Sequence, residues 1–78
     1  MPTILITRGF RFYFYSGDHV EPAHIHATKD GCVAKFWLDP VRLASGGRFR
    51  PAQLIEIQRM VDDNKDLFIR SWHEYFHD

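Results

Sequence analysis

Residues 10–15 read Phe-Arg-Phe-Tyr-Phe-Tyr, so three phenylalanines alternate with one arginine and two tyrosines. Alternation with a period of two is typical of a β-strand that buries one face. The phenylalanines are therefore expected to face the core, and the residues between them the opposite side. Residues 3–7 are mostly β-branched and apolar, and Arg8-Gly9 follows them as a turn signal. We therefore predict a hairpin of strands 3–7 and 10–15.

Two further strands are expected at residues 24–28 and 32–38. They flank Asp30-Gly31, a dipeptide that favours tight hairpin turns. The segment between the hairpins, residues 16–23, is rich in turn formers and is predicted to be a loop. Asp39-Pro40 ends the last of these strands, and residues 41–44 fit either a short strand or one helical turn.

The second half of the chain is predicted to be one long helix over residues 51–77. Pro51 suits the first helical position, because its missing N–H would have no partner there in any case. Asn64-Lys65 interrupts the apolar stripe of this segment, which leaves a bend or break near residues 62–64 open. The stripe has a period near 3.6 residues and comprises Leu54, Ile57, Val61, Phe68, Trp72 and Tyr75.

These elements predict one α+β domain over residues 1–78, with strands mainly in 1–44, a loop at 45–50 and the helix at 51–77. The expected architecture is an antiparallel meander of three to four strands with the long C-terminal helix packed on one face. The side chains expected to face the helix are Phe10, Phe12, Phe14, Ile25, Ala27, Ala34, Phe36 and Leu38.

Composition bears on whether the chain is a polyanion binder, a disulfide-bonded or zinc protein, or a membrane protein. Net charge is zero, whereas strong polyanion binders are usually basic. Cys32 is the only cysteine, which excludes an internal disulfide and a cysteine-based zinc site and fits a reducing compartment. No apolar run approaches the roughly 20 residues of a membrane span, and the first residues lack a signal-peptide pattern. We expect a cytoplasmic location, no membrane association and no bound cofactor.

The sheet face opposite the helix is expected to be rich in aromatic and cationic side chains. One interpretation is nucleic-acid binding, because rings on a sheet stack bases and cations bind phosphates. Another is an interface with a partner protein or a second copy, since Tyr, Trp and Arg are enriched there. A third is a second core layer covered by loops 16–23 and 44–50. Strand alternation assigns to this face Arg11, Tyr13, Tyr15, His24, His26, Thr28, Lys35 and Trp37.

The segment His24-Ile25-His26 places two imidazoles on one side of a strand, about 7 Å apart along the chain. That spacing permits a shared metal ion or an acid–base pair. His19 and Glu21, in the preceding loop, could join them. The pattern is common, and two ordinary surface histidines remain the simpler interpretation.

A second histidine pattern, His73 to His77, matches the HExxH motif of zinc hydrolases. The motif falls in the expected last turn of the helix, where fraying would loosen a metal site. We therefore expect Trp72 and Tyr75 or Phe76 to anchor the helix end, with His73 and His77 near solvent.

Several segments together resemble a bacterial domain-of-unknown-function family, number 4160. The segments are 1–4, 11–16, 22–27, 34–38, the Phe49-x-Pro51 helix entry and 72–76. The family is often encoded beside another small family, number 2442, in arrangements like toxin–antitoxin pairs. The resemblance therefore implies a partner encoded nearby and toxicity directed at RNA or translation. Two departures are Arg50, where the family usually has a serine, and His77, which the family pattern does not need.

The leading hypothesis is an interaction protein of a small bacterial two-gene module of the toxin–antitoxin type. It would bind a cognate partner protein or RNA through Arg11, Tyr13, Tyr15, Lys35 and Trp37. Whether the chain is an enzyme stays open. In a nuclease, His24 and His26 would be the catalytic acid–base groups, and Arg11 and Lys35 would hold the phosphate.

Two alternatives come from other classes of protein. One is a small metal-binding protein or metal-dependent hydrolase that uses His24, His26 and a third ligand, for which His19 is the candidate. The other is a homodimerisation module without catalysis.

Overall fold

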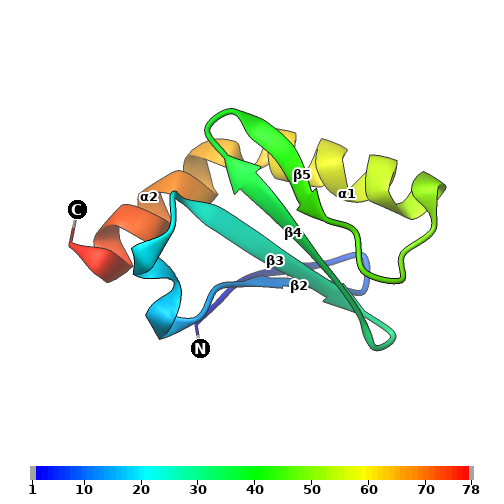
Figure 1. Cartoon of the computed structure of the whole chain (residues 1–78), viewed down its shortest axis with the longest axis horizontal. Coiled ribbons are helices and arrows are strands. Elements are labelled where there is room, and N and C mark those ends of the chain that lie inside the picture. The colour runs from blue at the N-terminus through cyan, green and yellow to red at the C-terminus, as the bar shows by residue number, and fades with distance from the viewer. Residues whose placement is uncertain (1, 78) are drawn as a thin grey trace.

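The computed structural model describes residues 2–77 and shows one five-stranded antiparallel sheet with two C-terminal helices on one face (Figure 1). The α+β class and the meander are confirmed, because the strands are ordered β1-β2-β3-β4-β5. The strands are β1 (Thr3–Thr7), β2 (Phe10–Tyr13), β3 (His24–Lys29), β4 (Cys32–Leu38) and β5 (Val41–Ser45).

The fifth strand, β5, corrects the expectation of three to four strands. Its sequence, Val-Arg-Leu-Ala-Ser, has no clear alternation, so periodicity alone left it undecided. Pairing with β4, which matches Trp37 with Arg42 and Leu38 with Val41, supplies the hydrogen-bond partners that make this segment a strand.

Both tight hairpin turns have the backbone that their sequences predict. Arg8 and Gly9 have φ values of 53° and 82°, and Asp30 and Gly31 have 51° and 80°. Positive φ at both central residues matches the right-handed twist of the flanking strands. These turns confirm the β1–β2 and β3–β4 hairpins.

The loop between β2 and β3 contains a short 3-10 helix, η1 (Ser16–Val20). Strand β2 ends at Tyr13, two residues earlier than predicted. The N–H of Tyr15 is instead bonded to the side chain of Asp18, at 2.8 Å. A local side-chain acceptor thus replaces the sheet ladder at this point.

The prediction of one long helix is wrong, and the break that the sequence left open near residues 62–64 is present: the segment forms α1 (Pro51–Asp63) and α2 (Lys65–Phe76), which Asn64 separates. The Asn64 side chain donates to the carbonyl of Met60 at 2.8 Å, and its backbone departs from helical values, with φ −113° and ψ 16°. An asparagine side chain competes with the backbone for such acceptors. Neither helix is long and apolar enough to cross a membrane.

The start of α1 confirms Pro51 at the first helical position and shows how the helix is capped without a serine. The N–H of Arg50 donates to the side-chain oxygen of Gln53, at 3.0 Å. This bond is one half of a capping box, so one of the N–H groups at the helix start has a partner.

The core lies between the sheet and the two helices. All eight side chains predicted to face the helix are buried, which confirms the register of β2, β3 and β4. Phe12 packs on Phe68 of α2 with ring centroids 5.2 Å apart. Of the predicted stripe, Leu54 is partly buried and Tyr75 is 42% exposed. The remaining stripe residues, Ile57, Val61, Phe68 and Trp72, are buried.

We expect Gly47→Ala to lower the free energy of unfolding by about 1–2 kcal/mol or more. Gly47 has a φ of 56°, and a Cβ there would overlap the carbonyl oxygen of Val33. The left-handed backbone and the overlap would each destabilise a residue with a Cβ at this position. Urea unfolding followed by circular dichroism measures the change, with Gly17→Ala as the control, because no atom lies within 4 Å of a Cβ at Gly17. Equal stability of both variants would contradict the prediction.

Candidate functional site

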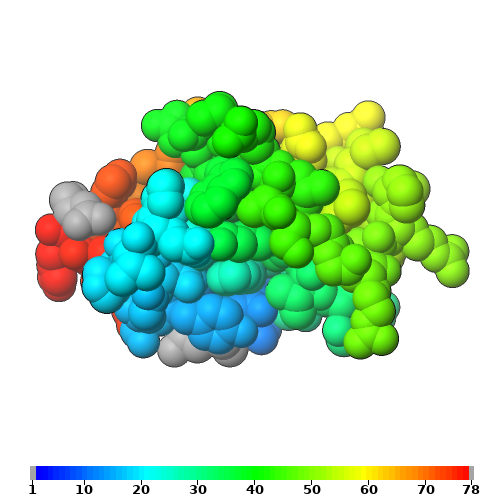
Figure 2. Space-filling view, in the orientation of Figure 1, coloured from blue at the N-terminus to red at the C-terminus, as the bar shows by residue number. Residues whose placement is uncertain are grey.

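The face of the sheet opposite the helices carries the predicted aromatic, imidazole and cationic side chains in rows across the strands. Tyr13, His26 and Lys35 lie opposite one another on β2, β3 and β4. His24 lies opposite Trp37 in the neighbouring row. We call this surface the outer face. In Figure 2, β3 lies recessed between β2, β4 and the loop that contains η1.

Most rings of the outer face are covered by their neighbours. The guanidinium of Arg11 lies over the Tyr13 ring at 4.5 Å, and the ammonium of Lys35 lies over Trp37 at 4.6 Å. Tyr13 is almost fully buried, whereas Tyr15 is 46% exposed. At Tyr13 the outer face is thus a second packed layer, and Tyr15 is its accessible ring.

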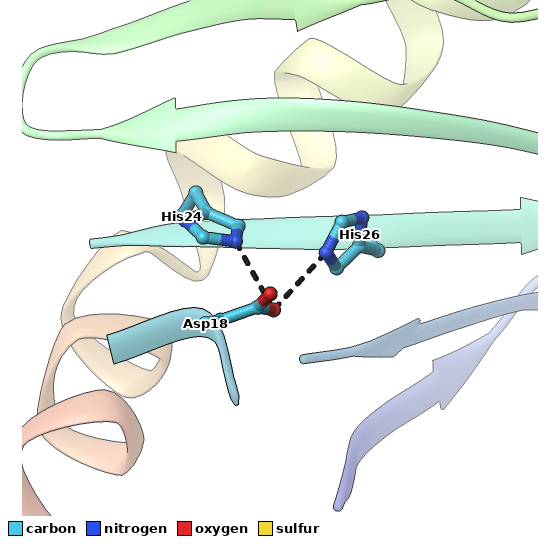
Figure 3. A group of neighbouring side chains, drawn as sticks. All are labelled: Asp18, His24 and His26. Atoms are coloured by element: carbon cyan, nitrogen blue, oxygen red, sulfur yellow. Dashed lines mark hydrogen bonds and ion pairs between the residues drawn. The ribbon is translucent and has the colours of Figure 1, made fainter. Parts of the chain in front are cut away.

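Asp18 of η1 is held over the start of β3 (Figure 3). Its Oδ2 atom accepts from the N–H of Tyr15 at 2.8 Å. Its own N–H donates to the carbonyl of Tyr15, and its carbonyl accepts from the N–H of Glu21, both at 3.0 Å. The 3-10 turn therefore fixes the position of the carboxylate.

His24, the first residue of β3, is fully buried. The indole of Trp37 and that of Trp72 from α2 cover its ring, with centroids 5.7 Å and 5.0 Å away. Its Nδ1 lies 2.9 Å from the carbonyl oxygen of Pro22. Because a carbonyl only accepts, Nδ1 carries a proton, and in the neutral imidazole Nε2 carries the free lone pair.

The Nε2 atom of His24 is buried and has no hydrogen-bond partner. Asp18 Oδ2 lies 3.1 Å away, but it is not aligned to accept a hydrogen bond from this nitrogen. Leaving a buried polar atom unpaired costs roughly 1–3 kcal/mol. Among the buried side-chain nitrogen and oxygen atoms of residues 2–77, His24 Nε2 is the one without a hydrogen-bond partner.

His26 lies two residues further along β3 and contacts the same carboxylate. Its Nε2 is 3.1 Å from Asp18 Oδ2 and donates to it. The Tyr13 ring stacks on the imidazole with centroids 5.3 Å apart and planes at 23°. Burial lowers the pKa of His26, and this effect outweighs the nearby Asp18 carboxylate, which acts to raise that pKa. The lowered pKa favours the neutral ring at pH 7.

Two carboxylates and one ammonium lie at this end of the outer face. Burial acts to raise the pKa of Asp18, but the Tyr15 N–H and the nearby imidazoles outweigh it and hold that pKa below its usual range. Asp18 is therefore ionised at neutral pH. Glu21 Oε1 lies 2.6 Å from Lys35 Nζ, and this bond lowers the pKa of Glu21.

Asp18, His24 and His26 have the spacing of a metal-ligand set. One ligand atom of each lies within 4.8 Å of the others, and the two N···O distances are both 3.1 Å. Ligand atoms about 2.1 Å from a shared ion would lie about 3.4 Å apart in tetrahedral geometry. Small side-chain adjustments would bring all three within bonding distance.

The family assignment follows from a comparison with protein-family models. The model described as Domain of unknown function (DUF4160) matches residues 9–73. The chain belongs to the DUF4160 family. The match includes Asp18, His24 and His26 as well as most of both helices. Comparisons with curated proteins and with solved structures give no significant match.

The DUF4160 structure brings some of the candidate residues together and separates others. His24 and His26 lie side by side, but His19 is exposed and its ring packs on Phe76, with centroids 5.8 Å apart. Asp18, and not His19, is the third metal-ligand-type side chain beside His24 and His26. Sequence analysis did not select it, although an acidic residue in the loop before the two histidines was the available signal.

The HExxH residues of the DUF4160 chain do not form a metal site. His73, Glu74 and His77 are exposed, and His77 ends α2 with a left-handed backbone. Across residues 2–77, the group of ligand-type side chains with metal spacing is that of Asp18, His24 and His26. Trp72 and Phe76 pack on Phe14 and thereby anchor this helix end.

We expect the DUF4160 domain to lose stability between pH 10 and pH 12 through Tyr13. Burial raises the pKa of Tyr13 from 10.0 to about 12, helped by the neighbouring hydroxyl of Tyr15. A raised pKa means that the folded state keeps the proton while the unfolded chain releases it, so stability falls as pH rises through this window. Thermal unfolding across the window measures the loss, which should be smaller in Tyr13→Phe; an unchanged slope would contradict the prediction.

Proposed function

We propose that this DUF4160 protein binds a divalent transition-metal ion through Asp18, His24 and His26. The observation that carries the proposal is the buried, unpartnered Nε2 of His24. A neutral imidazole nitrogen is a common metal ligand, and an ion at this point would give the atom the partner that it lacks.

The surroundings of His24 support this function. Metal-bound histidines usually donate their other N–H to a carbonyl or carboxylate, which fixes the tautomer and the ring orientation. The bond from Nδ1 to the Pro22 carbonyl is of this kind. The Trp37 and Trp72 rings add an apolar wall that limits access of water.

The donor set indicates the class of metal. Two imidazole nitrogens and one carboxylate favour Zn²⁺, Fe²⁺, Co²⁺ or Ni²⁺ over Ca²⁺ and Mg²⁺, which prefer oxygen ligands. Three protein ligands leave at least one coordination position open, as in catalytic zinc sites. His26 would release its Nε2 proton on binding and carry one on Nδ1 instead.

Metal titration of untagged, chelator-treated protein tests the proposal. We expect one equivalent of Zn²⁺ or Co²⁺ to bind with a dissociation constant below about 1 µM. Calorimetry measures the affinity, and the absorption of bound Co²⁺ reports its coordination. His26→Gln should lose this binding, and the control His19→Ala should keep it. Substoichiometric binding, or equal affinity in both variants, would reject the proposal.

A second candidate function is partner binding in a two-gene module of the toxin–antitoxin type, in the cytoplasm. The supporting observation is that α1 and α2 lie on the other face of the sheet, and that Arg11, Tyr15 and Lys35 on the outer face retain exposed surface. Such side chains contact protein or RNA. Co-expression and pull-down with the neighbouring gene product, with growth assays of each gene alone, would test it. Absence of both capture and toxicity would reject it.

A further inference from the structure

An ion pair lies next to the proposed metal position. Glu21 Oε1 is 3.9 Å from His24 Nε2 and 2.6 Å from Lys35 Nζ. Glu21 and Lys35 have side-chain exposures of 44% and 22%, compared with 0% for His24 and 14% for His26. A ligand from solvent would therefore meet this pair at the entrance to the site.

The position of Lys35 is fixed from two directions. The β3–β4 register places it directly opposite His26, and its ammonium lies over the Trp37 ring, which in turn contacts His24. The ammonium is thus held beside the metal ligands and not free in solvent. A cation fixed there would repel a bound metal dication unless an anion lies between them.

The present anion is the Glu21 carboxylate, whose Oε1 lies within 4 Å of both His24 Nε2 and Lys35 Nζ. Asp18, Glu21 and Lys35 contribute two carboxylates and one ammonium to this site. A divalent cation would change the net charge of this group from negative to positive. The loaded site would then attract a further anion.

We propose that the open position of the metal site binds a phosphoryl oxyanion, held jointly by the metal ion and the Lys35 ammonium in place of Glu21. This inference rests on the proposed metal binding. A tetrahedral oxyanion offers one oxygen to the metal and another to the ammonium, and lysine is a common phosphate-binding residue.

A hollow on the far side of Trp37, the residue that contacts both Lys35 and His24, indicates that the phosphoryl group belongs to an ester. The hollow has a volume of about 300 Å³ and is lined by Pro22, Ala23, Trp37, Asp39, Pro40 and Arg42. Trp37 connects the two places, because the Lys35 ammonium lies over its ring and Trp37 is one of the residues that line the hollow. Proline and indole surfaces suit a flat organic group. The substrate class is therefore a phosphate ester with an aromatic substituent.

Calorimetric titration of the loaded protein tests the inference. Protein with one equivalent of Zn²⁺ and no free ion is titrated with inorganic phosphate and with phenyl phosphate. We expect both to bind, phenyl phosphate more tightly, and neither to bind the metal-free protein. Equal affinities would overturn the assignment of the hollow, and no binding to the loaded protein would overturn the whole inference.

Variants of the ion pair separate this inference from metal binding. Lys35→Met should retain Zn²⁺ but weaken phosphate binding roughly 10-fold or more, because a charge-assisted hydrogen bond is lost. Glu21→Gln should strengthen phosphate binding, since it removes the competing carboxylate. Lys29→Met, on β3, is the matched control and should change neither. The inference would be overturned if Lys35→Met kept its phosphate affinity or if Glu21→Gln failed to bind Zn²⁺. If the wild-type protein itself failed to bind Zn²⁺, the proposed function would be rejected instead.

Discussion

Replacing Asp18 with asparagine is expected to weaken metal binding by about 100-fold or more. Asp18 Oδ2 lies 3.1 Å from the Nε2 atoms of both His24 and His26, so it is the shared member of the ligand set. Asparagine keeps the shape and an oxygen acceptor for the Tyr15 N–H but lacks the charge. Loss even of a residue that only orients a ligand costs 10–100-fold, and loss of the anionic ligand should cost more.

The control for this variant is Asp39→Asn, which also removes one carboxylate. Asp39 is 79% exposed and its nearest cation is Lys65, at 3.8 Å. Calorimetry with Zn²⁺ should show wild-type affinity for this control and a large loss for Asp18→Asn. Circular dichroism of both metal-free variants checks that the fold is retained. Similar affinities would show that Asp18 is not a ligand.

Metal binding should also stabilise the folded domain. A ligand that binds only the folded state at 100 times its dissociation constant adds about 2.7 kcal/mol. Wild-type protein should therefore unfold at higher urea concentration with Zn²⁺ present, and Asp18→Asn should respond much less, by about 0.4 kcal/mol if its affinity is 100-fold weaker. A response of equal size in the variant would place the ion elsewhere.

The second large effect is expected from Phe68→Ala in the core. Phe68 is fully buried and packs on Phe12 across the helix–sheet interface. Removing a buried phenylalanine side chain costs about 3–5 kcal/mol, because apolar contacts are lost and a cavity remains. Small domains have total stabilities near the low end of 5–15 kcal/mol. We therefore expect the variant to be largely unfolded at 37 °C.

The adjacent residue provides the control for Phe68→Ala. Leu67 is on the same helix and is 36% exposed, so Leu67→Ala removes an apolar side chain with far less buried contact. Urea unfolding of both variants gives the comparison, and the control should lose less than about half as much stability. If both variants unfolded at the same urea concentration, the assignment of Phe68 to the core would be contradicted.

The sequence predicted the fold best where side-chain period and turn chemistry agreed. Phenylalanine alternation in residues 10–15 identified the buried face of β2, and Asp30-Gly31 identified the β3–β4 hairpin. These signals are local, because they depend on backbone geometry within a few residues. Strand β5 lacked such a signal, and at Asn64 the interrupted apolar stripe allowed a break without deciding it. Pairing with β4 decided that residues 41–45 form a strand. At Asn64 the backbone departs from helical values, while its side chain and its N–H both donate to the Met60 carbonyl.

For the candidate site, too, some features follow from the sequence and others only from the tertiary structure. Residues two positions apart on a strand point to the same side, so the sequence by itself determined that His24 and His26 could act together. It also determined the family, through segments spread along the chain. Only the tertiary structure decided that η1 turns Asp18 toward both imidazoles, and that Trp72 of α2 closes over His24. The physical reason is that loop conformation and helix docking depend on contacts between residues that are far apart in the sequence. The spacing of apolar side chains along one segment does not report such contacts.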